Sequence, residues 1–352
     1  MILNPQRDPL AVPVTLEQAL APEWLERALA PISGGGAISS VQLAENIAGM
    51  ASKLRIKVYF ADAPDRARSF CLKAFLDSAD GLAGGGITTI REARFYLELA
   101  PQTTIRVPGC ANALIDVDAQ RGILILDDLL AGGARFCSAR EAFTDTQTAQ
   151  TLEQIARLHA ASALLPAASW LPCRIEQLAA EPRFTVERVQ ALLDDPRGDG
   201  LPARTRSAAL LFRGIKALAA RNTALPQTLL HGDCHPNNIY WTADGPGFAD
   251  WQLVQRGNWA LDVAYHIAAV LPIAAAEREE RALLDHYLDA LRACGAEGPD
   301  RDTAWDDYRA AQIYGYFHWA ITRRVAPDVT REMTQRLGAG VTRHETYRLL
   351  GL

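Results

Sequence analysis

Residues 229–252, LLHGDCHPNNIYWTADGPGFADWQ, concentrate side chains that can carry out chemistry. The stretch holds two histidines, three aspartates, two asparagines and one cysteine beside two short apolar runs. Alternating histidine and aspartate side chains can ligate zinc, and a cysteine next to a histidine can act as a nucleophile with its base. Aspartate and asparagine oxygens can instead hold magnesium and a phosphate. Three kinds of active site are therefore open at this point.

The rest of the chain favours the magnesium site over the other two. A zinc site built on His231, Asp233 and His235 would make the protein a metallohydrolase, but no second cluster of His, Cys or Asp at ligand spacing accompanies it. Cys234 and His235 are adjacent, and adjacent side chains rarely point to the same place. The metallohydrolase remains the weaker alternative, and stoichiometric zinc in elemental analysis would support it.

Strand and turn signals place an asparagine next to an aspartate. Residues 238–241 and 247–250 are strand-like and flank a turn at 242–246, which is rich in residues that bend the backbone. In an antiparallel hairpin the start of the first strand lies beside the end of the second, so Asn238 is expected to meet Asp250. An amide oxygen beside a carboxylate suits magnesium.

Asp233 lies five residues before Asn238, in a loop stiffened by Pro236, and can reach the same place as a proton acceptor. The resulting pattern is His231-x-Asp233-x-x-x-x-Asn238, followed by a hairpin and Asp250. It resembles the catalytic and metal-binding loops of the protein-kinase-like fold.

Two motifs make the resemblance more specific. "HGDCHPNN" and "ADWQ" are most similar to the aminoglycoside phosphotransferase, choline kinase and ecdysteroid-kinase-like branch of that fold, whose members phosphorylate small molecules. In this branch the metal-binding aspartate is commonly followed by an aromatic residue and then Glu or Gln, as Trp251 and Gln252 follow Asp250. The resemblance implies an α+β, two-lobed protein-kinase-like fold. Its N-lobe is an antiparallel sheet plus a helix, and its larger C-lobe is mainly helical.

The family pattern requires further residues, and the sequence supplies them in the right order. A lysine belongs on the third strand, where "FCLKAFL" supplies Lys73, and a glutamate on the following helix, where "REARFY" supplies Glu92. An apolar strand leading into a hinge is found in "LILDDL" at 124–129. "ARLHA" and "LDVAYHI" are similar to two C-lobe helices of the family. The match covers about residues 38–320, and this order is more specific than any single motif.

The resemblance also implies roles. Lys73 would hold the nucleotide phosphates, and Glu92 would orient Lys73. Asn238 and Asp250 would bind Mg²⁺ that bridges the phosphates of ATP, and Asp233 would accept or orient the proton of the substrate hydroxyl. Three other residues are expected to be structural: His159, His231 and Asp262, the last through hydrogen bonds to the catalytic loop.

Nucleotide contacts are expected at two further places. Backbone groups at Asp128 and Leu129, in the hinge, are available to an adenine. The loop over the phosphates departs from the kinase pattern, because "NIAGMASKL" has a single glycine, Gly49. The small residues Ala51 and Ser52 can still let the backbone approach a phosphate.

Periodicity divides the chain near residue 128. Thr15 and Gln18 form a possible capping box for a first helix that Pro22 interrupts, and residues 63–65 are expected to form a turn. Strands are expected at 38–47, 53–60, 69–76, 113–117 and 122–126, helices at 15–30 and 87–100, and mostly helices over 141–221 and 259–325. With the family resemblance, this division implies a nucleotide-binding N-lobe at 1–127, with an N-terminal helical extension, and a C-lobe at 128–352 with the catalytic loop and the acceptor site.

Composition excludes several classes of protein. At 352 residues the chain exceeds one usual domain, and its net charge of −5 argues against a nucleic-acid partner. The sequence contains no run of about 18 apolar residues, so no membrane span is predicted. The first residues do not resemble a signal peptide, so the cytoplasm is expected. Six scattered cysteines indicate reduced thiols rather than disulfides. A monomer or homodimer is expected.

The acceptor is the least defined part of the prediction. Residues 277–307 contain ten acidic residues, and an aromatic run follows them, so a cationic amine could be received there. The stronger interpretation puts the acids on solvated faces and the aromatics in the core. The expected function is Mg²⁺-dependent transfer of the ATP γ-phosphate to a hydroxyl of a small molecule. A catalytically silent, nucleotide-binding pseudokinase is the alternative.

Overall fold

The structure is a computed structural model of the whole chain, and it describes residues 10–47, 51–77, 86–180 and 184–352. The chain forms two compact units. The N-terminal unit comprises residues 1–101, 107–135 and 250–252, and the C-terminal unit comprises 102–106, 136–249 and 253–352. The class predicted from the sequence is confirmed: an antiparallel sheet in the N-terminal region precedes a largely helical C-terminal region.

A five-stranded antiparallel sheet forms the N-terminal unit. In sheet order the strands are β1 (Ile38–Ile47), β2 (Ser52–Phe60), β3 (Ala63–Ala74), β5 (Arg121–Asp127) and β4 (Cys110–Asp116). Buried and more exposed residues alternate along β2, as expected for a strand with one face in the core. All five predicted strands are therefore present.

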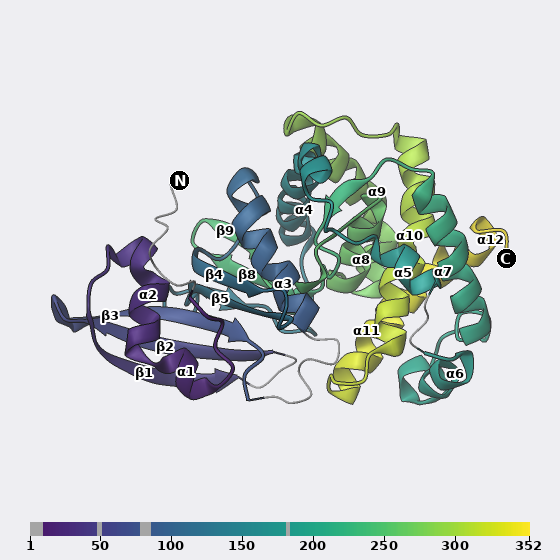
Figure 1. Cartoon of the computed structure of the whole chain (residues 1–352). Coiled ribbons are helices and arrows are strands. Elements are labelled where there is room, and N and C mark those ends of the chain that lie inside the picture. Colours follow the sequence, from purple (N-terminus) through teal and green to yellow (C-terminus); the bar gives the residue numbers. More distant parts are fainter. Residues whose placement is uncertain (1–9, 48–50, 78–85, 181–183) are drawn as a thin grey trace. The chain divides into compact units, whose positions relative to one another are not determined.

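Two short helices cover one face of this sheet (Figure 1). The capping box at Thr15 and Gln18 is present and starts α1 (Leu16–Leu20). Pro22 begins α2 (Pro22–Ser33), at the first position of a helix, where its missing N–H costs no hydrogen bond. Their buried side chains join the β2 and β3 side chains in one apolar core, so the opposite face of β2 and β3 remains for polar residues.

The predicted turn at residues 63–65 is wrong. The turn lies at residues 61–62, and β3 already begins at Ala63. The pairing passes from Tyr59 opposite Ala67 directly to Phe60 opposite Ala63, so Pro64 lies in a bulge. A proline is tolerated there because a bulge needs no ladder hydrogen bond from it.

A third helix packs on β5. It is α3 (Gly86–Arg94), which continues into a π-helical turn (Phe95–Leu99) and a 3₁₀ turn (Ala100–Gln102). Gly122 of β5 allows the close approach, because a Cβ atom there would lie 3.0 Å from the backbone of Thr89. The sheet and α3 together hold the residues expected to bind nucleotide.

The C-terminal unit is built mainly from helices. These are α4 (Asp145–Ala160), α5 (Arg174–Ala180), α6 (Val186–Asp194), α7 (Ala208–Thr223), α8 (Ala260–Val270), α9 (Ile273–Ala293), α10 (Arg301–Ile321), α11 (Pro327–Arg343) and α12 (Thr346–Leu349). Every residue of α8 is buried. Gly315 of α10 faces the Tyr265 ring of α8, where a Cβ atom would lie only 2.5 Å away. Among these described helices, none combines the length and apolarity needed to cross a membrane.

Two short strand pairs frame the predicted catalytic loop, residues 231–238. The first pairs β7 (Thr228–Leu230) with β10 (Gln255–Gly257), and the second pairs β8 (Ile239–Thr242) with β9 (Gly245–Phe248). A two-residue strand, β6 (Arg135–Phe136), precedes α4 in the chain.

The predicted hairpin is present, but its register is shifted by one residue. Thr242 pairs with Gly245, so the loop has two residues instead of five. Asn238 is consequently opposite Ala249, whose N–H donates to the Asn238 carbonyl at 2.8 Å, and not opposite Asp250. Gly245, at φ 110°, permits the tighter turn.

Candidate active site

Lys73, Glu92 and Asp250 form one buried ionic cluster in the N-terminal unit. Lys73 Nζ lies 2.7 Å from Glu92 Oε2 and 2.7 Å from Asp250 Oδ1. The Lys73 and Glu92 side chains are 4% and 1% exposed, so this ion pair is screened from water. Strand β3 supplies the lysine and α3 the glutamate, as the sequence predicts.

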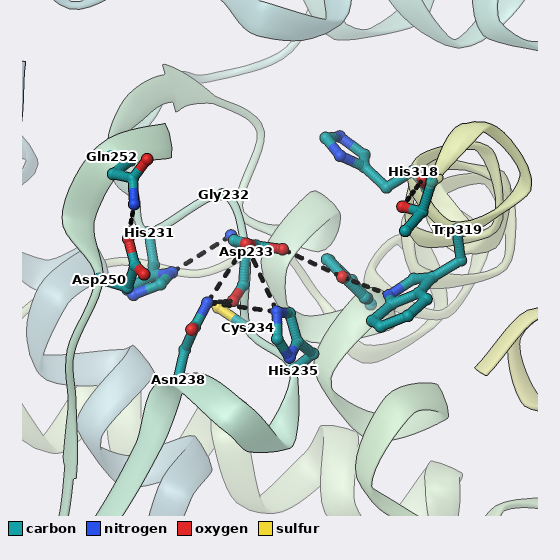
Figure 2. Close-up of polar contacts among 12 residues, drawn as sticks. His231, Gly232, Asp233, Cys234, His235, Asn238, Asp250, Gln252, His318 and Trp319 are labelled. Carbon is teal, nitrogen blue, oxygen red and sulfur yellow. Dashed lines mark hydrogen bonds and ion pairs between the residues drawn. The ribbon is translucent and has the colours of Figure 1, made fainter. Parts of the chain in front are cut away.

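The residues after Asp250 connect the cluster to α3. The Trp251 N–H donates to Glu92 Oε1 at 3.1 Å, and the Trp251 ring stacks on Phe95 with 3.8 Å between centroids. Gln252 Nε2 donates to Asp250 Oδ1 (Figure 2). Asp250 itself has φ 65°, in the left-handed region, which is strained for a residue with a side chain and is often found at functional sites.

The charges of the cluster stabilise one another. Burial alone would lower the pKa of Lys73, but Asp250 and Glu92 raise it above its ordinary value, so the amine stays charged. Burial would raise the pKa of Asp250, but the two lysines near it, Lys73 first and then Lys53, hold it below its ordinary range. Burial raises the pKa of Glu92, with Asp250 acting in the same direction and Lys73 opposing it. Asp250 is therefore an ionised carboxylate, suited to a hard cation.

A second lysine, missed in the sequence, completes the cluster. Lys53 of β2 places its Nζ 3.2 Å from Asp250 Oδ2. The signal was present, because the alternation of β2 puts Lys53 on the face that does not enter the core. What the sequence did not show was that this face also carries Lys73, because pairing between strands determines which residues become neighbours.

The expected adenine hinge follows β5 directly. Asp128 is engaged within the N-terminal unit: its carboxylate accepts from Arg55 Nε at 3.1 Å, and its carbonyl accepts from the Gly132 N–H. The Leu129 carbonyl accepts from the Ala134 N–H at 2.9 Å. In the part of the chain that the structure describes, the Leu129 N–H has no hydrogen-bond partner, which leaves one hinge donor for a ligand.

The phosphate loop is only partly described. Gly49 lies outside the described residues, and so does most of the glycine-rich stretch before α3. Ala51 is buried, and Ser52 begins β2 opposite Ala74.

In the C-terminal unit, a buried aspartate fixes the backbone of the catalytic loop. Asp262, near the start of α8, accepts from the N–H groups of His231 and Gly232 at 2.7 and 2.9 Å. His159 Nε2 lies 3.4 Å from the same carboxylate. Gly232 has φ 83°, and a Cβ atom there would lie 2.4 Å from the Leu253 carbonyl oxygen. This position therefore requires glycine.

His231 takes part in the same framework. Its Nε2 donates to the Ala249 carbonyl at 3.0 Å, which leaves Nδ1 to accept from the Asp233 N–H at 3.2 Å. One imidazole thus joins the catalytic loop to the end of the β8–β9 hairpin.

Asp233 is held by side chains on both of its oxygens (Figure 2). Oδ1 accepts from the Tyr265 hydroxyl at 3.1 Å, and that hydroxyl in turn accepts from Trp319 Nε1 at 2.7 Å. Oδ2 accepts from Asn238 Nδ2 at 3.2 Å and lies 3.5 Å from His235 Nε2. The carboxylate is therefore oriented before any substrate is present.

Tyr265 and Trp319 were not singled out in the sequence. Tyr265 lies three residues after Asp262 on α8, so the two share a helix face, and this spacing was a usable signal. Trp319 comes from α10, and only the packing of α10 on α8 brings it near.

The imidazoles around Asp233 favour its ionised form. Burial alone would raise the pKa of Asp233, but its neighbours, His235 first and then His318 and His231, hold it below its ordinary value. The side chain is therefore a carboxylate at neutral pH. It can accept a hydrogen bond from a hydroxyl and orient that hydroxyl's proton.

Asn238 offers an oxygen to a metal. Its Nδ2 donates to the carbonyl and to the carboxylate of Asp233, so its amide orientation is determined by these two acceptors. Within the described residues no donor binds Asn238 Oδ1, which leaves this oxygen as a candidate ligand.

The thiol and zinc interpretations find no support in the described residues. Cys234 is fully buried, and burial first, then the nearby Asp262 and Asp233, raises the pKa of its thiol well above the ordinary value. A thiol that stays protonated is a poor nucleophile. No group of three or more His, Cys, Asp or Glu side chains in the described ranges is arranged to hold a metal ion.

The acids and aromatics after residue 277 are accounted for within the C-terminal unit. The aromatic run that follows the acids is buried, as the stronger interpretation of the sequence expected; it consists of Tyr308, Tyr314, Tyr316, Phe317 and Trp319. Many of the acids pair with arginines instead of lining a cation site. Such pairs are Asp285–Arg301, Asp289–Arg292, Asp302–Arg281, Asp306–Arg309, Asp307–Arg221 and Glu280–Arg343.

Two buried histidines make stability depend on pH. Burial first lowers the pKa of His266 to about 4 and that of His318 to about 3, against an ordinary value of 6.5. Between these values and 6.5 the unfolded chain binds more protons than the folded chain, so stability falls as pH falls. We expect the free energy of unfolding to drop by about 2–4 kcal/mol between pH 7.5 and 5, since each pKa unit is worth about 1.4 kcal/mol.

Urea unfolding at these two pH values measures this dependence. His318→Asn should flatten it by about half, whereas the partly exposed His286, which lies 3.2 Å from Glu153, provides the control as His286→Asn. An equal slope in wild type and His318→Asn would contradict the assignment.

A Lys–Glu pair between strand β3 and helix α3, and an HxDxxxxN loop in a helical unit, are the features that the sequence predicts for a phosphotransferase of the protein-kinase-like fold. Residues 79–310 match the model of the phosphotransferase enzyme family (APH). This is well over half of the chain, and the chain therefore belongs to that family. Comparison with curated proteins gave no match.

Solved structures with the same fold include a candidate aminoglycoside phosphotransferase from Ralstonia eutropha JMP134. It is 14% identical, with a TM-score of 0.51 over 93% of this chain and 96% of that one. Choline kinase LicA from Streptococcus pneumoniae is 14% identical, with a TM-score of 0.49 over 91% and 98%. Macrolide 2'-phosphotransferase MphH from Brachybacterium faecium is 15% identical, with a TM-score of 0.47 over 92% and 98%. At such identity the likeness shows the fold alone.

Proposed function

We propose that this phosphotransferase moves the γ-phosphate of ATP to a hydroxyl group of a small molecule in a Mg²⁺-dependent reaction. The observation that carries the proposal is the cluster in which Asp250 is ionised and lies 2.7 Å from Lys73, itself paired with Glu92. Phosphoryl transfer needs positioning and neutralisation of charge more than covalent catalysis, and this cluster offers both signs of charge in a buried setting.

The donor atoms fit magnesium. An ionised carboxylate, Asp250, and an amide oxygen without a protein donor, Asn238 Oδ1, are both hard oxygen ligands. When bound, Mg²⁺ would neutralise phosphate charge. We assign Lys73 to the phosphates, Glu92 to the orientation of Lys73, and the backbone near Ser52 to phosphate approach.

Asp233 acts on the acceptor in this proposal. Its carboxylate is ionised and is held by Tyr265 and Asn238, so it can accept the acceptor's hydroxyl proton or orient it. The hinge at Asp128 and Leu129 would receive the adenine. The pairing of many α9 and α10 acids with arginines gives no support to a polycationic acceptor, so we propose no amine requirement.

A thermal-shift titration with ATP, with and without Mg²⁺, tests the proposal without knowledge of the acceptor. A ligand that binds only the folded state raises its melting temperature; at a hundred times Kd the gain is about 2.7 kcal/mol. We expect a Mg²⁺-dependent rise with ATP that is lost in Asp250→Asn, because asparagine tolerates the left-handed backbone but lacks the charge. Asp244→Asn, in the exposed hairpin turn, is the matched control.

Two outcomes would count against the proposal. No shift with millimolar MgATP would contradict nucleotide binding. A normal shift in the wild type, with no phosphate transfer to any acceptor and no metal-dependent ATP hydrolysis, would favour the silent pseudokinase.

A further inference from the structure

Strand β2 places a second lysine directly opposite Lys73. The register pairs Lys53 with Lys73 across β2 and β3. Both side chains project from the face opposite the apolar core, which receives Leu54 and Leu72 instead. Two ammonium groups therefore share one small area of the sheet.

Like charges directly opposite on neighbouring strands are destabilising unless something offsets them. Here the Asp250 carboxylate divides between the two lysines: Oδ1 is 2.7 Å from Lys73 and Oδ2 is 3.2 Å from Lys53. One carboxylate thus bridges both cations and offsets their repulsion.

The two lysines differ in how firmly they are held. Lys73 is 4% exposed and also pairs with Glu92, whereas Lys53 is 39% exposed. Asp250 is the one ion-pair partner that Lys53 has within the described ranges. Arg55, the next residue on the same face of β2, is occupied by Glu45 and Asp128. Of Lys53, Lys73 and Arg55, Lys53 is thus the one whose side chain can leave its ion-pair partner without breaking an ion pair with a buried carboxylate.

We infer that Lys53 is a second phosphate-binding residue, which neutralises the polyphosphate of the nucleotide where the loop before it has a single glycine. The inference rests on the proposed function. If Asp250 serves a metal ion, Lys53 loses its carboxylate partner at the place where phosphates would be held. A nucleoside triphosphate carries more negative charge than one divalent cation neutralises, and Lys53 supplies the missing positive charge.

The test compares Lys53→Gln with Lys53→Arg and with Lys57→Gln. Lys57 lies on the same face of β2, is exposed and pairs opposite Ser69. It therefore matches Lys53 in residue type and strand face, but it does not lie opposite Lys73. Thermal-shift titrations with MgATP, MgADP and adenosine give an apparent Kd for each variant. Because adenosine lacks phosphates, it reports on the hinge alone.

We expect Lys53→Gln to weaken MgATP and MgADP about 3- to 10-fold, as for loss of one partly exposed charge-assisted hydrogen bond, with adenosine unchanged. Lys53→Arg should keep most of the affinity, and Lys57→Gln all of it. Equal MgATP affinity in wild type and Lys53→Gln would overturn this inference but not the proposed function. So would an equal loss for adenosine, which would indicate a structural role. Absence of any MgATP shift in the wild type would instead overturn the proposed function.

Discussion

Replacement of Asp233 by asparagine should lower kcat by about 10²–10⁴-fold, the usual contribution of a positioned acid–base group. The thermal shift with MgATP should stay within about twofold of wild type, because Asp233 makes none of the contacts in the Lys73 cluster. Asparagine is nearly the same size, and its oxygen can still accept from the Tyr265 hydroxyl. The fold of the loop should therefore survive while the proton acceptor is lost.

Single-turnover phosphate transfer, measured with saturating acceptor, checks this expectation. Asp244→Asn makes the same chemical change at an exposed position and should leave kcat unaltered. If Asp233→Asn retained full turnover, its assigned role would be refuted. If it also lost the MgATP shift, the effect would be structural.

Lys73→Met should cost about 3–5 kcal/mol of folding stability as well as turnover, because removing one partner of a buried ion pair leaves the other charge uncompensated. Glu92 is 1% exposed and would keep only the Trp251 N–H and neighbouring charges as partners. Since burial already raises the pKa of Glu92, taking up a proton limits the loss, and the cost should shrink as pH falls.

A double-mutant cycle separates stability from activity. Adding Glu92→Gln to Lys73→Met should recover about half or more of the lost stability, since the unpaired charge is then gone. Activity should not return. Urea unfolding and turnover of the two single variants and the double variant give both quantities, with Lys57→Met as the control for loss of an exposed lysine from the same sheet. Additive stability effects would contradict a direct Lys73–Glu92 pair.

Local pattern was sufficient for much of the fold. The alternation in β2 and the capping box at Thr15 are short-range signals, and both elements formed as predicted. The hairpin register was missed by one residue because Gly245 permits a tighter turn than the run of turn-forming residues suggested. Turn length is decided by one or two backbone angles, which composition does not specify.

In the candidate site too, the residues on local motifs were predicted, and those brought in by long-range packing were missed. Asp233 and Asn238 could be found because motif spacing places them on one loop, whereas Lys53, Tyr265 and Trp319 were missed, although local spacing indicates the face of Lys53 on β2 and of Tyr265 on α8. Their contacts with the site depend on strand pairing and helix packing between residues far apart in the sequence, so no single segment predicts them.

The three residues 250–252 belong by their contacts to the N-terminal unit, although more than a hundred residues separate them from its other parts. The unit is therefore discontinuous in sequence. A fragment ending at residue 135 would contain the lysine and glutamate of the cluster but not its bridging carboxylate or the ring stacked on Phe95. Recombination at one junction could not transfer this ionic cluster intact. Exchange with a relative would have to include the short segment after the β8–β9 hairpin, so the two units are expected to evolve as one piece.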